Sequence, residues 1–548
     1  MTFCKFETLL KSKQFVQINE DPTERFERRV QTTLRELKKK KRFTQVEYNN
    51  IYPSSSRPGR FYATGKRHKV PENCKDVNQL PLRPIVSNIG TATYGISKYL
   101  AKLLHPLSVS DYTINSTNDF VNKMKDEEVP TGYKLVSFDV TSLFTNVPLD
   151  HTINLILRKI YREKLIKTKI QRKEMKMLLE LCTKELHFCF NNKMYKQVDG
   201  VVMGNPLGPV IANIFMVELE NIKVPTMSNM LTKWHRYVDD TIAFVKEDQI
   251  ENVLTILNSY HKDIKFTHEV EENAELPFLD VMLHREQNNK LRLKVYRKKT
   301  CSNIYLHWKS FAPTSWKIGT LDGMIRRAHI VCTNQADLET ELSFVENVFK
   351  TINGYPQRII QQSKDKVKAK LAQQNTVELP NDDIPSNEEE IDEKRKPFMI
   401  MPYAGERGEK VMKKVMRKIP EDVRPRIVYT GTKLSSFFPV KDEIKDKYIS
   451  NIVYYFDSAS ENNVDYTGET KCRWGKRIVE HQGRDKKSAI VINFQSKNLA
   501  PPQTGEFRIL AKNYPNRLKR RIAESLYIKE NKSSLNVQVD CYKLKLFN

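Results

Sequence analysis

The sequence has few of the features on which secreted, zinc-binding or membrane-spanning proteins depend. Its eight cysteines are widely spaced, and no two have the spacing of a zinc knuckle. At this density a disulfide scaffold is not expected, and reduced thiols indicate an intracellular protein. No apolar run approaches the roughly 20 residues that a membrane-spanning helix needs, and the first residues lack the apolar centre of a secretory signal. We therefore expect no membrane partner.

Acidic residues are also in short supply. The chain has 92 lysines and arginines against 66 aspartates and glutamates, which gives a formal net charge of +26 over 548 residues. A positive field of this size attracts polyanions, of which nucleic acid is the most common and an acidic membrane surface the second. Simple solubility is the alternative explanation. The chain is too long to fold around one hydrophobic core, so its length predicts about two to four domains.

One amphipathic helix is predicted near the N-terminus, over residues 21–42. Asp21 can cap this helix, and Pro22 suits its first position. Its apolar residues fall on one face, namely Phe26, Val30, Leu34 and Leu37. The basic run at 38–42 can contact phosphates or serve as a nuclear import signal, although a solvated helix end fits equally well. We expect a nuclear protein.

Changes in composition divide the rest of the chain. Strand-like segments alternate with helical ones, then a polar and acidic stretch follows, and a small α/β unit ends the sequence. The predicted regions are an N-terminal helical region at 1–60, a large domain at 61–350, a linker at 351–395, a connector at 396–450 and a C-terminal unit at 451–548.

Three carboxylates of the large domain form the strongest candidate site. Asp239 and Asp240 stand between two apolar segments that predict a strand–turn–strand hairpin, and Asp139 closes the apolar strand 134–140. Adjacent like charges repel unless a cation binds them, although most such pairs are solvated loop residues. Three carboxylates can hold two Mg²⁺ about 3.5–4 Å apart, an arrangement suited to nucleotidyl transfer.

Other segments of the large domain could contact a nucleotide. Glycines and prolines at 203–209 predict an ordered turn before an apolar helix, where the backbone can approach a flat ligand closely. Lys66, Lys69 and Arg83 are basic residues that could clamp a triphosphate, although a lone arginine is more often part of a surface ion pair.

The order of these motifs resembles the reverse transcriptase of Penelope-like retroelements. The resemblance covers residues 15–350 and includes RPIVSNIGTATYGISKYLAKLL, FDVTSLFTNVP, QVDGVVMGNPLGPVIANIFM, YVDD and VYRKKTCSNIYLHW. It implies an α+β right-hand polymerase with fingers, palm and thumb. It also implies an RNA template, a DNA primer and deoxynucleotide substrates.

The resemblance carries roles over to single residues. Asp139, Asp239 and Asp240 match the metal-binding carboxylates of the palm. Phe144 matches the steric gate that excludes the 2′-hydroxyl of ribonucleotides. The residues placed near the incoming nucleotide are Arg83, Lys69, Gln197 and the turn at 203–209. The segment 296–332 is similar to the start of the thumb.

The C-terminal unit reads, from its residues alone, as a small basic α/β module that could bind any polyanion. Two strand-like pieces at 452–456 and 465–470 precede helical stretches at 471–481 and 517–531. The unit resembles the GIY-YIG endonuclease domain that Penelope-like elements carry. The resemblance implies that Tyr454 or Tyr466 is the general base, that Arg477 stabilises the transition state and that Glu524 holds one Mg²⁺. The cysteines and histidines that bind zinc in relatives are missing, so we expect no structural zinc.

The sequence thus predicts an RNA-directed DNA polymerase of a Penelope-like retrotransposon, which nicks DNA and copies RNA onto the exposed 3′ end. An RNA-dependent RNA polymerase on the same palm is a second hypothesis, and Phe144 argues against it. A third is a domesticated nucleic-acid-binding protein, either inactive or retaining the polymerase but no endonuclease activity. The intact carboxylates Asp139, Asp239 and Asp240 argue against the inactive form.

Overall fold

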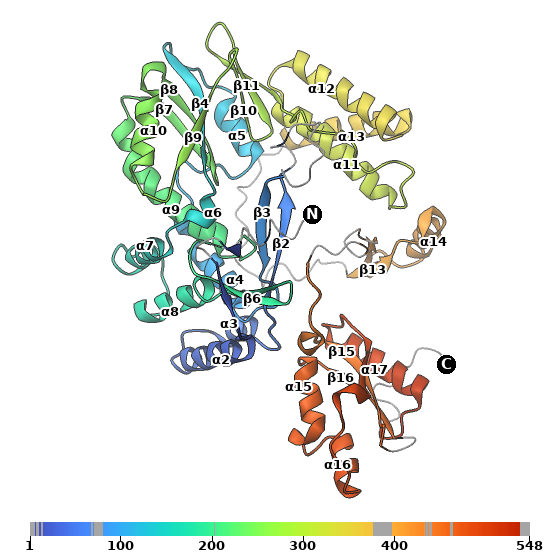
Figure 1. Cartoon of the computed structure of the whole chain (residues 1–548). Helices are drawn as coiled ribbons and strands as arrows, with labels where there is room; N and C mark the ends of the chain where they lie inside the picture. Colours follow the sequence, from blue (N-terminus) through green and yellow to red (C-terminus); the bar gives the residue numbers. More distant parts are fainter. Residues whose placement is uncertain are drawn as a thin grey trace.

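The computed structural model describes residues 6, 10–11, 15–66, 70, 80–201, 203–375, 397–431, 433, 437, 441–460 and 464–536. Helices and strands mix throughout, which confirms the α+β fold class. The two largest sheets and the thumb helices lie above the C-terminal unit in Figure 1. Within the described residues, no helix is both long and apolar enough to cross a membrane.

The palm is a four-stranded antiparallel sheet in the order β7-β8-β4-β9. Its strands are β4 (Tyr133–Val140), β7 (Leu231–Tyr237), β8 (Asp240–Lys246) and β9 (Phe266–Val270). Its helices include α7 (Leu149–Tyr161), α9 (Gly208–Lys223) and α10 (Ile250–Asn258). Strands were predicted at 134–140 and within 234–245, and both predictions are confirmed. One continuous hydrophobic core joins the sheet to these helices and to the N-terminal helix.

A second, mixed sheet lies beside the palm in the order β1-β6-β5-β2-β3. Its strands are β1 (Phe15–Ile18), β2 (Gly59–Gly65), β3 (Leu82–Ser87), β5 (His187–Phe190) and β6 (Lys193–Gln197). Aromatic rings fill its core, with Phe61 and Phe188 stacked 5.6 Å apart. Further helices lie between β1 and β5 in the sequence, namely α3 (Gln45–Ile51), α4 (Tyr94–Leu104), α5 (Thr117–Met124), α6 (Leu143–Asn146) and α8 (Arg172–Thr183).

The predicted N-terminal helix forms as α2 (Thr23–Lys39). Its four predicted apolar residues are all buried, which confirms the predicted face. Asp21 does accept hydrogen bonds at the start of the helix, from the Thr23 backbone N–H at 3.2 Å and from its hydroxyl at 2.7 Å. Pro22 lies one position before the helix rather than at its first residue. The basic run continues into a loop, where Arg42 pairs with Glu174 at 2.8 Å.

After the palm strands, the chain forms a small antiparallel sheet that packs on the palm, and the helices of the thumb region follow. The strands are β10 (Glu275–Phe278), β11 (Val281–Arg285) and β12 (Leu291–Val295). The helices are α11 (Thr314–Val331), α12 (Gln335–Asn347) and α13 (Gln357–Asn375). These helices share a core of their own that includes Leu321, Ile325, Val345 and Ile360.

The first half of the predicted linker 351–395 is folded, which corrects the sequence interpretation. Residues 357–375 form α13, which packs on α11 because Ile360 and Val367 stand seven residues apart on one face. The polar composition of the segment reflects its exposed face and concealed this sparse apolar stripe. Residues 376–396 lie outside the described part of the chain.

The connector and the C-terminal unit each contain one small sheet in the described part of the chain. In the connector, the parallel strands β13 (Phe398–Pro402) and β14 (Arg426–Thr430) are joined through α14 (Gly405–Arg417). The C-terminal unit has an antiparallel sheet in the order β16-β15-β17. Its elements are β15 (Ile452–Asp457), β16 (Asp465–Thr470), α15 (Trp474–Val479), α16 (Ala489–Ser496), β17 (Phe507–Ala511) and α17 (Arg517–Asn531). The strands and helices expected there are present.

Replacing a buried residue of α13 tests whether this segment belongs to the thumb. Ile360 is fully buried, so Ile360→Ala should destabilise the thumb by about 2–5 kcal/mol through lost burial and a cavity. The free energy of unfolding, from urea titration, measures this cost. Gln362→Ala on the exposed side of the same helix is the control and should change stability by less than about 0.5 kcal/mol. Equal effects of the two substitutions would restore the linker interpretation.

Candidate active sites

The palm sheet brings the three predicted carboxylates together at one end. Asp139 of β4 stands directly opposite Asp240 of β8 in the strand register. Asp239 occupies the two-residue turn between β7 and β8, and its carbonyl accepts a hydrogen bond from the Val140 backbone N–H at 3.3 Å. The hairpin expected from the sequence therefore exists and places the pair beside Asp139.

The charges of these residues act on one another. Partial burial raises the pKa of Asp240 to about 6, and the neighbouring carboxylates Asp239 and Asp139 contribute to that rise, while Lys298 opposes it. Asp139 and Asp240 line a cleft of about 640 Å³ together with residues of β9 and the thumb region. Among the described residues, no three His, Cys, Asp or Glu side chains already form a metal-binding group. The donor set of three carboxylates nevertheless fits a hard divalent cation, because a cation relieves the repulsion that raises this pKa.

A buried arginine that was not predicted supports the turn that carries Asp239. Arg236 and Glu220 are both fully buried, and the guanidinium binds the carboxylate through Nε–Oε1 at 2.6 Å and Nη2–Oε2 at 3.1 Å. The remaining nitrogen, Nη1, donates to the carbonyl of Val238 at 3.0 Å and to Asn213 at 2.9 Å. Trp234 also donates to Glu220 at 3.1 Å. This network ties the turn to α9.

The turn needs such support because its backbone is strained. Val238 has a φ of 59°, in the left-handed region that β-branched residues rarely occupy. The bond from Arg236 holds the carbonyl of this residue. Strain of this kind persists only where the surroundings over-determine the conformation. In the sequence, the only sign of this network was that Arg236 is a charged residue within the predicted hairpin segment 234–245. Its buried partner, Glu220, was not evident from the sequence.

The other predicted nucleotide-site residues lie on several different elements. Phe144 is partly buried in α6, just after β4, and its carbonyl accepts from the Val201 backbone N–H at 2.7 Å. Arg83 is exposed on β3. Gln197 is buried, and its amide donates to the Asp199 carbonyl at 2.8 Å, so it faces protein rather than the cleft. Lys69 lies outside the described residues.

The turn at 203–209 approaches a strand. Gly204 has a φ of 111°, and a side chain there would come within 2.4 Å of the Val86 carbonyl. The Val86 backbone N–H donates to the Met203 carbonyl at 2.9 Å. The sequence interpretation expected this turn to approach a flat ligand, whereas in the structure the glycine allows close approach to β3, the strand that carries Arg83.

The C-terminal unit gathers its predicted residues around one buried tyrosine. Tyr454 is fully buried, and its hydroxyl accepts a hydrogen bond from Arg477 Nε at 2.9 Å. The ring of Tyr466 is 6.2 Å away between centroids. Gly468 lies against both rings, since a side chain there would approach each within 2.6 Å. Glu524 of α17 is buried and close enough to act electrostatically on Tyr454.

A histidine that was not predicted completes this cluster. His481 Nε2 lies 2.6 Å from the Tyr454 hydroxyl, and its Nδ1 lies 2.6 Å from the Ser488 hydroxyl. Burial, reinforced by Arg477, lowers the pKa of His481 to about 3, so the ring is neutral and one of its nitrogens can accept a hydrogen bond. The predicted helical stretch 471–481 contained this residue, but spacing alone did not single it out.

Burial also perturbs the acids of the unit. It raises the pKa of Tyr454 far above its ordinary value, so this tyrosine is protonated at neutral pH. Burial and the neighbouring Glu469 raise the pKa of Glu524 to about 7. A carboxyl of this kind gains or loses a proton near neutrality, and such perturbed pKa values are common at functional sites.

Comparisons with known families agree with the palm. Residues 78–271 match the family described as reverse transcriptase (RNA-dependent DNA polymerase). Residues 304–365 match the animal helix-turn-helix domain, which spans much of α11 to α13 and was not predicted. No curated protein sequence matches the chain. The chain therefore contains a reverse transcriptase domain, and it is an RNA-directed DNA polymerase, as predicted.

Solved structures with similar folds are distant in sequence. A telomerase from Candida albicans, in complex with a fragment of telomeric RNA, has 12% identity and a TM-score of 0.40, with 68% of this chain and 70% of that chain covered. A telomerase from Candida tropicalis has 12% identity and a TM-score of 0.37, covering 67% and 65%. The RNA-dependent RNA polymerase of bacteriophage phi12 has 13% identity and a TM-score of 0.38, covering 61% and 59%.

Replacing the buried Arg236 should show whether its ion pair serves only stability or also primer extension. Arg236→Met leaves Glu220 buried without its partner and should cost about 3–5 kcal/mol of unfolding free energy. Adding Glu220→Gln removes that charge and keeps an acceptor for Trp234, so most of the stability should return. Primer extension should stay low in both variants, because Val238 has lost its donor.

Urea unfolding and steady-state extension by the same preparations make this comparison. Lys233→Met on the same strand, where the lysine is only partly buried, is the control and should affect both measurements little. Recovery of full extension in the double variant would show that the ion pair serves stability alone.

Proposed function

We propose that this polymerase belongs to a Penelope-like retrotransposon and copies RNA onto a DNA 3′ end. The supporting observation is the pairing of Asp139 with Asp240 across two strands, with Asp239 in the adjoining turn, inside the segment that matches reverse transcriptases. The partners would be an RNA template, a DNA primer and deoxynucleotides. The net charge of +26 favours such polyanions.

Two Mg²⁺ ions are the proposed cofactors of the palm. Asp139, Asp239 and Asp240 would hold them, with the cleft beside the thumb region leaving room for primer and nucleotide. Bound ions of this kind lower the pKa of an attacking hydroxyl and neutralise charge on phosphate oxygens. The role of the chain is to hold the carboxylates in place, through the strand register and the bond from Arg236 to the turn.

The choice of DNA over RNA as product is proposed to depend on Phe144. Its helix follows the strand of Asp139 directly, and its carbonyl is tied to Val201. A bulky ring there would clash with a 2′-hydroxyl. The RNA-polymerase hypothesis predicts a smaller residue at this position.

A DNA-nicking activity of the C-terminal unit is the second part of the proposal. Arg477 would stabilise the charge that develops on the phosphate, and Glu524 would hold a single Mg²⁺. Of the two tyrosines, Tyr466 is then the proposed acceptor of the water proton, because burial keeps Tyr454 protonated and its hydroxyl lies 2.6 Å from the neutral His481. The ring of Tyr466 lies beside the ring of Tyr454.

Nuclear localisation remains a proposal based on the basic run 38–42. In the structure this run ends α2 and partly neutralises Glu174 through Lys40 and Arg42. Lys39 and Lys41 are exposed and would be the accessible part of an import signal.

Loss of one palm carboxylate tests the polymerase. Asp239→Asn should lower extension of a DNA primer on an RNA template by more than about 100-fold, because even outer-shell partners of a metal contribute about 10–100-fold. Template RNA binding should persist, since no phosphate contact is lost. Asp248→Asn, exposed just after β8, is the matched control. Extension by the Asp239 variant at the control rate would disprove the assignment.

Loss of Glu524 tests the endonuclease. The full chain should nick supercoiled plasmid with Mg²⁺, and Glu524→Gln should abolish nicking without weakening DNA binding. The raised pKa gives the pH dependence a definite sign. The carboxyl is neutral below about pH 7, so nicking at limiting Mg²⁺ should rise as pH increases from about 6 to 8.

Glu530→Gln, exposed on the same helix, should nick normally with the same pH profile. Added zinc chelator should leave nicking unchanged, since zinc is not a proposed component. Binding without cleavage by the wild-type chain would favour the alternative, a polymerase whose C-terminal unit has lost its endonuclease activity.

A further inference from the structure

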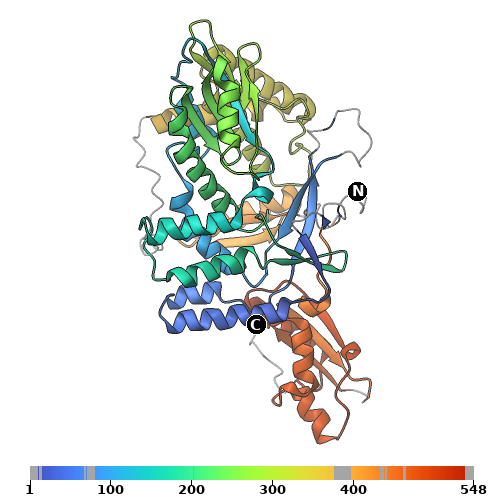
Figure 2. The ribbon, with the colours of Figure 1, turned by 60° about the vertical axis from the view of Figure 1, so that its left-hand side comes forward.

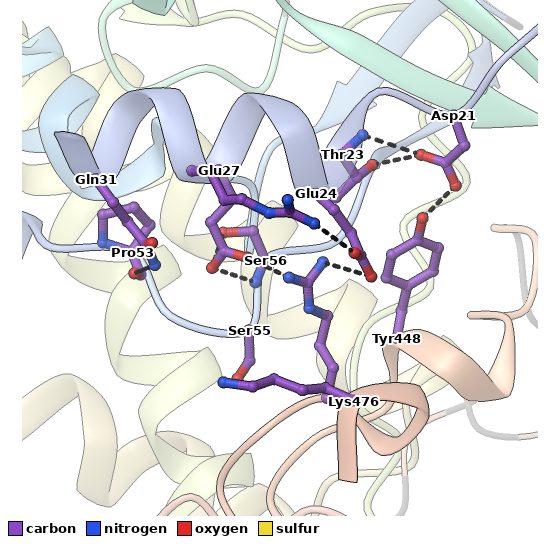
Figure 3. Close-up of polar contacts among 12 residues, drawn as sticks. Asp21, Thr23, Glu24, Glu27, Gln31, Pro53, Ser55, Ser56, Tyr448 and Lys476 are labelled. Atoms are coloured by element: carbon purple, nitrogen blue, oxygen red, sulfur yellow. Dashed lines mark hydrogen bonds and ion pairs between the residues drawn. The ribbon is translucent and has the colours of Figure 1, made fainter. Parts of the chain in front are cut away.

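The C-terminal unit lies against the N-terminal helix α2, although the two segments are more than 400 residues apart. Figure 2 shows the unit directly below α2, and Figure 3 shows Glu24 and Glu27 of that helix facing the loops of the unit. The contact is polar, and a charged pair is buried within it.

That pair consists of Glu27 and Arg473. Only 3% of Glu27 and 9% of Arg473 are exposed, and their Oε2 and Nη2 atoms are 2.5 Å apart. The other carboxylate oxygen accepts from the backbone N–H and the hydroxyl of Ser56, both at 3.1 Å. Ser56 therefore positions the Glu27 carboxylate independently of Arg473. Glu24 adds a weaker, exposed contact to the same guanidinium at 3.8 Å.

Further contacts on either side fix the angle of approach. The Tyr448 hydroxyl donates to Asp21 at the start of α2. Asp442 reaches the second sheet, where its carboxylate accepts from the Asn191 backbone N–H at 2.6 Å and its carbonyl accepts from Arg60 at 3.2 Å. The end of the connector therefore contacts both α2 and the sheet beside the palm, and these contacts, just before the C-terminal unit, restrain its rotation about the central pair.

The anchor is joined to the proposed nicking site by one helix. Arg473 immediately precedes α15, and its carbonyl accepts the backbone N–H of Arg477 at 3.1 Å. Arg477 is the residue that donates to Tyr454. A buried ion pair contributes little net stability, because the cost of desolvating both charges offsets most of their attraction. Its main effect is to favour one defined geometry. Its contribution here is to orient α15 relative to the polymerase.

We propose that the Glu27–Arg473 pair locks the C-terminal unit onto the polymerase in one orientation, and that this docking couples the two sites on one DNA. The coupling rests on the proposed nicking function, whereas the docking does not. A nick made by the unit would then reach the palm of the same molecule without release.

Hydrogen exchange of the full chain tests the docking. Glu27→Gln leaves Arg473 without a counter-charge, so peptides covering 441–451 and 52–56 should exchange about tenfold faster. Arg473→Gln should give the same pattern, and the double variant should be no worse than either single one. Glu36→Gln is the control, since it removes the same charge nine residues along α2, on the opposite and exposed face. Unchanged exchange in both single variants would overturn the docking.

Enzyme assays on the same variants test the coupling. In Glu27→Gln, extension of an oligonucleotide primer and plasmid nicking should each stay within about twofold of wild type, since Glu27 belongs to neither site. Synthesis primed at a nick made in the same reaction should fall about tenfold, in proportion to the loss of docking. Normal nick-primed synthesis with increased exchange would overturn the coupling. A wild-type chain that never nicks would disprove the proposed endonuclease, while the exchange result still decides the docking.

Discussion

The constraint on which the palm depends is the repulsion among three carboxylates held at one end of a sheet. The register of β4 and β8 places Asp139 opposite Asp240, and the turn adds Asp239. Nothing in the local sequence would keep such charges together. The arrangement persists because the turn is bound from behind by Arg236, whose charge is matched by Glu220 in the interior. A buried salt bridge therefore maintains an exposed cluster of like charge.

The C-terminal unit also holds a carboxyl group in a buried, charged environment, but with different neighbours. Its carboxylate, Glu524, is held beside Arg477 and the Tyr454–His481 pair, and burial keeps the tyrosine protonated and the histidine neutral. In both sites a carboxyl has its pKa raised toward neutrality, to about 6 for Asp240 and about 7 for Glu524. A bound cation would lower both pKa values again, because it favours the ionised carboxylates, and perturbed pKa values of this kind are common at functional sites.

The two sites are carried by parts of the chain that pack together. The folded thumb segment at 304–365 matches an animal helix-turn-helix domain, and it separates the palm from the connector in sequence. In space, the chain returns to its own N-terminal helix, where Glu27 meets Arg473. The helix that holds the N-terminal core together thus also receives the C-terminal unit. The apolar face of α2 packs in the N-terminal core, and its acidic residues contact the C-terminal unit.

The sequence by itself determined the local elements and the residue types of both sites. The apolar composition of 134–140 and 234–245 predicted β4 and the hairpin, the helical spacing of Phe26, Val30, Leu34 and Leu37 predicted α2, and the motifs indicated the carboxylates. These features depend on neighbours along the chain, so a linear pattern records them.

Only the tertiary structure decided which distant groups meet. Glu220 is buried beside Arg236 and Glu27 beside Arg473, yet a glutamate in a helix is usually exposed, so neither pairing could be inferred from composition. His481 became a partner of Tyr454 only when α15 packed against β15. Polar α13 was mistaken for a linker because two apolar residues suffice once another helix covers them. In each case the contact depends on burial between segments far apart in the chain, and a single sequence does not show which segments bury one another.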